Sequence, residues 1–176
     1  MKISVITVSY NSASTIKDTI QSVVSQNHDY KEYIIIDGGS TDKTMDIIRS
    51  FGDKINLVIS EKDNGIYEAI NKGIARATGD VISILNSDDC YAHSNVLSSV
   101  ADALSKSKTD SLFGDLDYVD ASMQKILRKW RSGEYNREKF MNGWMPPHPA
   151  FFLKRSAYEK FGTFNTEFTI SADYEL

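Results

Sequence analysis

The chain has 176 residues, of which 41% are hydrophobic, and a formal net charge of -4 at pH 7. This length suffices for one domain with a complete core and is short for two. The negative charge argues against a broad basic surface for DNA or RNA, so we expect no nucleic-acid partner. Cys90 is the single cysteine, which excludes an internal disulfide or a cysteine-rich zinc site and indicates a reducing, cytoplasmic location.

The first 110 residues alternate between strand-like and helix-like segments. Short β-branched apolar runs predict buried strands, and apolar side chains at helical spacing predict amphipathic helices between them. The expected strands are residues 3–8, 33–37, 55–60 and 81–85. The expected helices are residues 15–26, with Thr15 and Asp18 at capping-box spacing, 40–51, capped by Ser40, 66–77 and 96–104. This alternation predicts an α/β fold with a mostly parallel central sheet covered by helices on both faces.

From residue 111 the pattern changes. Residues 111–120 and 125–131 predict two short strands of an antiparallel hairpin. Further on we expect a short helix at 135–141, an extended loop at 146–149, a strand at 150–153 and a helix at 156–161 closed by Gly162. These elements predict a smaller antiparallel addition in the C-terminal half. Residues 174–176 look like the first turn of a helix, so we expect the natural sequence to continue beyond them.

No stretch of the sequence has the length and apolar composition of a transmembrane helix. The first apolar run, residues 1–8, is also too short for a signal peptide. Contact with the inner face of a membrane stays open, because a small basic or aromatic patch is enough for peripheral binding. Residues 125–131 are basic and amphipathic and could hold a lipid-diphosphate acceptor, but a solvated strand face is the alternative that we favour.

Two adjacent carboxylates, Asp88 and Asp89, follow the strand expected at residues 81–85. Two ionised carboxylates about 4 Å apart repel by roughly 1 kcal/mol in water and by about 4 kcal/mol at an effective dielectric constant of about 20. This cost indicates a compensating cation at the strand end. The alternative is that the pair only begins a turn, because Asp is common in turns.

Other polar residues follow the neighbouring expected strands: Asp37, then Glu61 and Asp63, then Asn86. Ligands of doubly wound sheets bind outside the carboxyl ends of the strands, so these side chains predict a negative crevice at one edge. The glycine-rich phosphate loops Gly-x-Gly-x-x-Gly and Gly-x-x-x-x-Gly-Lys-Ser/Thr do not occur. Mg2+ or Mn2+ bridging carboxylates to a nucleoside diphosphate fits the crevice instead.

Five segments follow one another in the order Ser4-Val5-Ile6-Thr7-Val8-Ser9-Tyr10-Asn11, Ile36-Asp37-Gly38-Gly39-Ser40-Thr41-Asp42, Glu61-Lys62-Asp63-Asn64-Gly65-Ile66-Tyr67, Asn71-Lys72-Gly73 and Leu85-Asn86-Ser87-Asp88-Asp89. Together they resemble glycosyltransferase family 2, whose fold is the Rossmann-like GT-A fold. Residues 162–165 and 171–176 also look like the acceptor half of this family. The resemblance therefore implies one domain over residues 1–176, with a nucleotide-sugar-binding half at 1–110 and an acceptor-side half at 111–176.

The resemblance implies a metal-dependent enzyme that moves a sugar, with inversion, from a nucleotide-diphosphate donor to an acceptor hydroxyl. A UDP-sugar is the expected donor, a saccharide or lipid-linked molecule the acceptor, and surface polysaccharide or glycoconjugate assembly the pathway. The matching positions imply donor contacts from Thr7, Ser9, Asn11, Asp37, Gly38, Asp63, Asn86, Ser87 and His148.

The segment Asn86-Ser87-Asp88 stands where the family has its Asp-x-Asp motif, so Asp88 is expected to bind Mn2+ or Mg2+. Asn86 departs from the first acid of that motif and leaves one charge fewer for the metal. An Asn can still donate a hydrogen bond to ribose or to a metal-bound water, and Asp89 is expected to add charge for the metal.

Asp173 matches the catalytic base of the family, although Ala172 replaces the Glu that normally precedes it. The alternative for Asp173 is an acid that only stabilises a helix N-terminus. For His148, a donor to phosphate, the alternative is a structural histidine.

Three other functions remain as alternatives. A nucleotidyltransferase would also need acidic metal ligands, but the glycine-rich N-terminal loop expected for it is missing. A non-catalytic module that binds nucleotide sugars or acts as a scaffold is favoured by Asn86 and Ala172. A glycoside hydrolase fits poorly, because its two carboxylates flank the scissile bond at about 5 to 9.5 Å, whereas Asp88 and Asp89 are sequence neighbours. Asp173 discriminates between transfer and binding, because only transfer needs a base.

Overall fold

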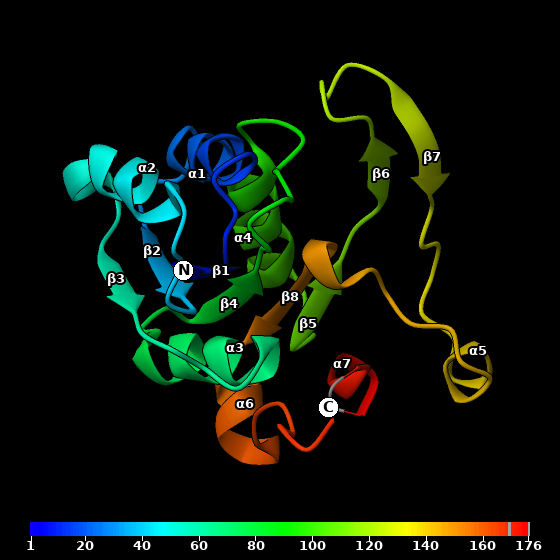
Figure 1. Ribbon diagram of the computed structural model, residues 1–176. Coiled ribbons are helices and arrows are strands. Elements are labelled where there is room, and N and C mark those ends of the chain that lie inside the picture. The colour runs from blue at the N-terminus through cyan, green and yellow to red at the C-terminus, as the bar shows by residue number, and fades with distance from the viewer. Residues whose placement is uncertain (169, 176) are drawn as a thin grey trace.

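The computed structural model describes residues 1–168 and 170–175. Its centre is a six-stranded sheet with the strand order β3-β2-β1-β4-β8-β5 (Figure 1). The strands are β1 (Ile3–Ser9), β2 (Lys31–Asp37), β3 (Leu57–Ser60), β4 (Val81–Ile84), β5 (Ser111–Phe113) and β8 (Phe151–Lys154). The neighbours β3, β2, β1 and β4 pair in parallel, whereas β8 is antiparallel to both β4 and β5. The expected mostly parallel α/β sheet is confirmed.

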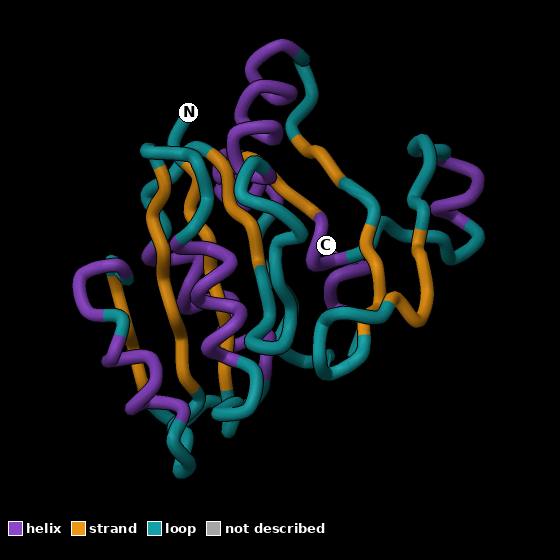
Figure 2. The backbone as a smooth tube through the Cα atoms, turned by 90° about the horizontal axis from the view of Figure 1, so that it is seen from above, coloured by secondary structure: helices purple, strands orange, loops and turns teal. Residues whose placement is uncertain are grey.

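Helices cover both faces of this sheet (Figures 1 and 2). The helices of the structure are α1 (Ile16–Val24), α2 (Thr44–Ser50), α3 (Ile66–Arg76), α4 (Val96–Lys106), α5 (Arg137–Met141), α6 (Arg155–Phe161) and α7 (Ala172–Glu175). Of these, α5 lies apart from the central sheet (Figure 1). Short 3-10 turns form at Gly52–Lys54 and His148–Ala150. Among the described residues, no helix is long and apolar enough to cross a membrane.

The two faces of the sheet have separate apolar clusters, because successive side chains of a strand point to opposite sides. Along β1, Ile3 and Val5 pack with α1, α2 and α4, whereas Ile6 and Val8 pack with α3, α6 and α7. Every residue of β1 is buried. A strand covered on both faces is rich in β-branched apolar residues without alternation, which explains why its short apolar run located it in the sequence.

The expected single strand at residues 111–120 is wrong, because the structure divides it between two sheets. β5 ends at Phe113, and Leu116–Val119 form β6, which pairs only with β7 (Ile126–Trp130) in a separate two-stranded sheet. Between them, the Gly114 amide donates to the Ala150 carbonyl at 2.9 Å. The predicted hairpin is therefore β6–β7 alone, and it extends away from the central sheet (Figure 1).

Two predicted helix caps are also wrong. Thr15 makes no side-chain cap hydrogen bond to α1, and its hydroxyl donates back to the Ser12 carbonyl at 3.4 Å. Ser40 does not cap α2, which begins at Thr44; its hydroxyl donates to Asp37 Oδ1 at 2.5 Å. The carboxylate of Asp42 accepts the Thr44 amide at 2.9 Å in its place.

The remaining elements lie close to their predicted positions. The helix expected at 135–141 is α5, whose N-cap is Asn136. The loop expected to be extended at 146–149 instead enters a 3-10 turn at His148. The final turn is α7, and Leu176 lies outside the described residues.

Candidate active site

A pocket of about 440 Å³ lies where β1 and β4 end and α3 begins. Five residues predicted for the site line it together, from three separate parts of the chain: Ser9, Asp63, Asn86, Ser87 and Asp88. The other lining residues are Val8, Tyr10, Ser12, Gly65, Ile66 and Ala69. The carboxyl edge of the sheet therefore carries a pocket with two carboxylates and several neutral polar groups.

Asp37 is 0% exposed and lies behind the pocket rather than in its wall. Its carboxylate accepts hydrogen bonds from the hydroxyls of Ser9, Ser40 and Ser60 and from the amides of Gly39 and Ser40, at 2.5 to 3.1 Å. Burial alone would raise the pKa of Asp37, but the donors from Ser40 and Ser60 outweigh it and lower the pKa. The ionised carboxylate therefore ties together the ends of β1, β2 and β3.

Gly38 brings the loop after β2 against Asp63. Its amide donates to the Ser9 carbonyl at 2.9 Å. A Cβ added at Gly38 would lie 2.7 Å from Asp63 Oδ2, closer than side chains tolerate. Because Gly38 has no side chain, Asp63 can lie in the pocket wall, where its Oδ1 accepts a hydrogen bond from the Gly65 amide at 3.1 Å.

Asn11 and Thr7 do not line the pocket. Asn11 has a left-handed φ of 48° and joins two loops, since its Oδ1 accepts the Thr41 amide at 2.9 Å and its own amide donates to Ser40 Oγ at 2.8 Å. Thr7 is 0% exposed, and its hydroxyl lies 3.1 Å from that of Tyr33 in the core. Asn11 thus shapes the rim of the pocket, and the Thr7 hydroxyl is paired inside the sheet.

The segment after β4 presents Asn86 and Asp88 to the pocket, whereas Asp89 is absent from its wall. Burial, and next the charge of Asp88, raise the pKa of Asp89 to about 6. Asn86 Oδ1 is buried without a hydrogen-bond partner in the described part of the chain. An unpaired buried carbonyl oxygen costs free energy, so this atom is available to a ligand.

These residues fit a divalent cation shared with a diphosphate. Within residues 1–168 and 170–175, no three His, Cys, Asp or Glu side chains form a complete metal cage. Mg2+ needs no such cage, because it is commonly held by one or two carboxylates together with substrate phosphates. The Asp88 carboxylate and the unpaired Asn86 oxygen are hard oxygen ligands of the required kind.

Asp173 lies in α7, and Tyr67 of α3 reaches it. The Tyr67 hydroxyl donates to Asp173 Oδ1 at 3.4 Å and accepts the Ala172 amide at 3.1 Å. Tyr67 follows Gly65 and Ile66, which line the pocket. The first turn of α3 therefore adjoins both the pocket and the predicted base.

His148 belongs to the surroundings of Asp173 rather than to the pocket wall. Its ring packs edge-on against Phe164, with centroids 5.9 Å apart. Burial lowers the pKa of His148, and the charge of Asp173 partly opposes this effect. A neutral imidazole beside a carboxylate can donate one hydrogen bond and accept another.

Two contributors were missed in the sequence. Tyr10 lines the pocket with a side chain that is 65% exposed, and its position directly after the first strand was the available signal. Asn71 binds the main chain of Phe164. It lies four residues after Tyr67, so the two share a helical face, which was the signal for a common role.

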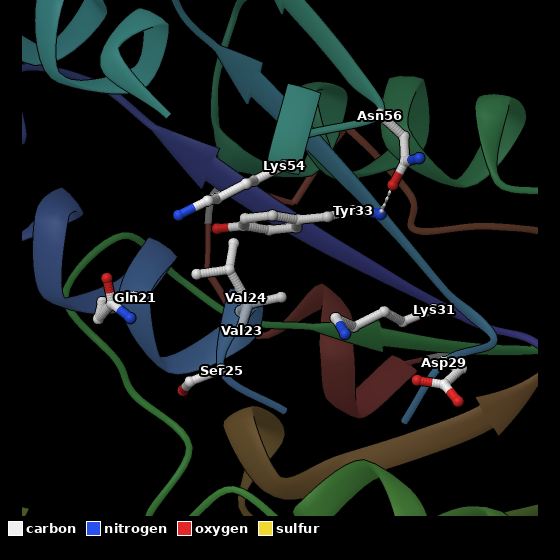
Figure 3. A pocket seen from close by; sticks show the side chains of 9 residues that line it. All are labelled: Gln21, Val23, Val24, Ser25, Asp29, Lys31, Tyr33, Lys54 and Asn56. Atoms are coloured by element: carbon white, nitrogen blue, oxygen red, sulfur yellow. Dashed lines mark hydrogen bonds between the residues drawn. The ribbon is translucent and has the colours of Figure 1, made fainter. Parts of the chain in front are cut away.

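A second pocket, of about 400 Å³, lies near the amino ends of β2 and β3, opposite the predicted site (Figure 3). None of the predicted site residues line it. Lys31 Nζ donates to the carbonyls of Gln26 and His28, and Asn56 Oδ1 accepts the Tyr33 amide. These polar groups are thus paired within the protein, which leaves the carboxyl-edge pocket as the stronger candidate.

The sequence model of the family described as Glycosyl transferase family 2 matches residues 4–162. The chain belongs to glycosyltransferase family 2. The protein named "Uncharacterized glycosyltransferase Rv1514c" from Mycobacterium tuberculosis is 33% identical over 183 residues, a match that covers 99% of this chain and 66% of that protein. This family 2 chain therefore spans about two thirds of that relative.

Two solved structures share the fold of this family 2 chain. S. aureus TarS 1-349 in complex with UDP-GlcNAc has a TM-score of 0.81 at 21% identity, over 99% of this chain and 51% of that one. The mannosyltransferase PcManGT from Pyrobaculum calidifontis, in complex with GDP-Man and Mn2+, has a TM-score of 0.71 at 20% identity, over 94% and 48%. The expected GT-A fold is confirmed.

Proposed function

We propose that this chain transfers a sugar, with inversion, from a UDP-linked donor to an acceptor hydroxyl. The proposal is supported mainly by the position of α3, whose first turn borders the pocket and also contacts Asp173. A pocket with Asp63, Asn86 and Asp88 in its wall lies on one side of the first turn, and Asp173 contacts Tyr67 in the same turn. The residues proposed to bind the donor thus lie close to the residue proposed to remove the proton.

The donor occupies the carboxyl-edge pocket in this proposal. Asp63 accepts a hydrogen bond from the nucleoside, and the exposed ring of Tyr10 offers a surface on which the base can stack. Ser9, Asn86 and Ser87 contact the donor, while Asp37, Gly38 and Asn11 hold the loops that position these groups. A UDP-sugar is supported by the TarS complex with UDP-GlcNAc.

Asn86 and Asp88 would together hold Mn2+ or Mg2+ beside the diphosphate of the donor, and Asp89 would add charge nearby. A metal ion bound there would offset the negative charge of the departing diphosphate. The Mn2+ of the PcManGT complex supports a divalent ion in this fold. Because Asn86 carries no charge, the cation would be bound chiefly when a diphosphate supplies further oxygen ligands.

Asp173 acts as the general base. Its carboxylate takes the proton of the acceptor hydroxyl as that oxygen forms a bond to the anomeric carbon. The bond between this carbon and the diphosphate oxygen breaks on the opposite face, so one displacement inverts the carbon. His148, held neutral near Asp173, donates a hydrogen bond to a phosphate oxygen.

The acceptor side is formed by residues 111–176 of a single domain, and residues 1–110 bind the donor. The acceptor is a saccharide or lipid-linked molecule in surface polysaccharide or glycoconjugate assembly, reached from the cytoplasmic face of a membrane. Family membership supports the transfer of a sugar, and the acceptor and pathway belong to this proposal.

Calorimetric titration of UDP, GDP and dTDP, with and without Mn2+, tests the donor site. We expect UDP to bind most tightly and Mn2+ to strengthen its binding by about tenfold or more. Asp88→Asn should remove the Mn2+ effect, whereas Asp46→Asn, an exposed change on α2, should keep it. A UDP affinity that changes neither with Mn2+ nor in Asp88→Asn would contradict the assignment of the metal site.

A further inference from the structure

Two side chains on one face of α3 hold the segment that leads to Asp173. Asn71 Nδ2 donates to the Phe164 carbonyl at 2.7 Å, and the Phe164 amide donates to Asn71 Oδ1 at 3.0 Å. The ring of Tyr67 stacks on that of Phe164, with centroids 5.6 Å apart and planes 16° apart. Phe164 is 4% exposed. Its main chain and its ring are therefore both fixed to α3.

The hydroxyl of Tyr67 extends this attachment to the predicted base. It accepts the Ala172 amide at 3.1 Å and donates to Asp173 Oδ1 at 3.4 Å. Burial and the charge of Asp173 raise the pKa of Tyr67, so the hydroxyl keeps its proton and remains a donor. Directly before this contact, Ser171 has a left-handed φ of 66°, which is uncommon for a residue other than glycine.

The same helix borders the donor pocket. Gly65, Ile66 and Ala69 line that pocket, and Tyr67 lies between them in sequence while its hydroxyl faces Asp173. A helical turn holds its side chains at nearly fixed distances from one another. Such precision matters, because a catalytic group misplaced by about 1 Å can cost about 100-fold in rate. One turn of α3 thus borders the pocket and contacts the predicted base.

We propose that Tyr67 is a positioning residue, whose hydroxyl fixes the carboxylate of Asp173 relative to the donor bound beside the first turn of α3. This inference rests on the proposed role of Asp173 as the base. Tyr67 touches no reacting atom in this assignment. It acts on the orientation of Asp173 through Oδ1 and on the start of α7 through the Ala172 amide.

Tyr67→Phe in the full-length protein is the direct test, because it retains the ring that stacks on Phe164 and removes only the hydroxyl. We expect kcat for sugar transfer to fall about tenfold, the value of one hydrogen bond to a charged group. The Kd of UDP measured by calorimetry should stay within about twofold, because Tyr67 does not line the donor pocket. A role limited to folding would lower the donor affinity and kcat together.

Tyr158→Phe is the matched control. Tyr158 also packs on Phe164, with centroids 6.3 Å apart, but the described hydrogen bonds of Asp173 do not include it. Its variant should keep the wild-type kcat. Tyr67→Phe should also add no further loss to the residual transfer of Asp173→Asn, because a positioning group acts only through the group that it positions.

The outcomes separate this inference from the proposed function. Wild-type kcat in Tyr67→Phe, together with abolished transfer in Asp173→Asn, would overturn the role of Tyr67 and leave the base in place. Independent, additive losses in the double variant would also overturn it. Wild-type turnover in Asp173→Asn would overturn the proposed base and the inference together.

Discussion

Asn71 holds both main-chain polar groups of Phe164, a residue 93 positions later in the chain, through one side-chain amide. An Asn amide offers a donor and an acceptor on the same planar group, so it can make the two hydrogen bonds that a neighbouring strand would make to one residue. This contact attaches the segment before α7 to α3. It also explains why an Asn, rather than another small polar residue, suits this position on the helix.

Asn71→Ala should lower the free energy of unfolding by about 2–4 kcal/mol, because it leaves the Phe164 amide and carbonyl without partners. Asn71→Asp keeps an acceptor for the amide but places a charged oxygen against the Phe164 carbonyl, so it should also destabilise the protein at pH 7. Urea denaturation of the two variants measures the difference. Equal stability of Asn71→Ala and the wild type would show that the two hydrogen bonds between Asn71 and Phe164 do not stabilise the fold.

Gly73→Ala should destabilise the protein by about 1–3 kcal/mol, although Ala is the better helix former. A Cβ at this position would overlap Ile6 Cγ2 and lie 3.4 Å from Ile36 Cγ1, so α3 would have to move away from the sheet. Thermal unfolding measures the loss, with Arg76→Ala at an exposed position of the same helix as the control. A stabilised Gly73→Ala protein would show that this close approach is not needed.

Much of the sheet was predictable from local sequence, whereas long-range pairing was not. Apolar runs and glycine punctuation located β1 to β4, and parallel pairing then placed Asp63 and Asp88 at one edge. Nothing local indicated that Phe151–Lys154 would insert antiparallel between β4 and β5. The same limit applies to Ser40, whose hydroxyl can cap a helix or bind Asp37 with equal local chemistry, and to the contact between Tyr67 and Asp173.

Glu32→Gln should lower stability at pH 7 and should lower it less near pH 3. Burial alone would raise the pKa of Glu32, but hydrogen bonds from Ser4 and Thr78 lower it to about 2. A lowered pKa means that the ionised form stabilises the fold above the unfolded pKa of about 4.5, and that this contribution is lost as the pH falls toward 2.

The expected loss for Glu32→Gln at pH 7 is about 1–2 kcal/mol, because solvent screens part of the interaction with Lys2. Urea denaturation at pH 7 and about pH 3 measures it. A loss of the same size at both values would show that the charge of Glu32 contributes nothing.

Asn86→Asp should tighten Mn2+ binding in the presence of UDP by about tenfold, because it adds a charged oxygen ligand where a neutral one lacks a partner. Without metal, the same variant should be less stable at pH 7, because a third carboxylate joins Asp88 and Asp89. Calorimetric titration of Mn2+ tests the first effect, with the remote, exposed Asn27→Asp as the charge control. An unchanged Mn2+ affinity would show that the cation does not bind next to Asn86.

The most direct test of the central claim is sugar transfer by Asp173→Asn in the full-length protein, measured beside its UDP affinity. We expect transfer to fall by at least about 100-fold, since general-base catalysis contributes roughly that much, while the Kd of UDP stays unchanged. Normal turnover by Asp173→Asn with intact UDP binding would contradict it. A wild-type protein that binds UDP-sugars and transfers none of them to any acceptor would instead favour a binding module.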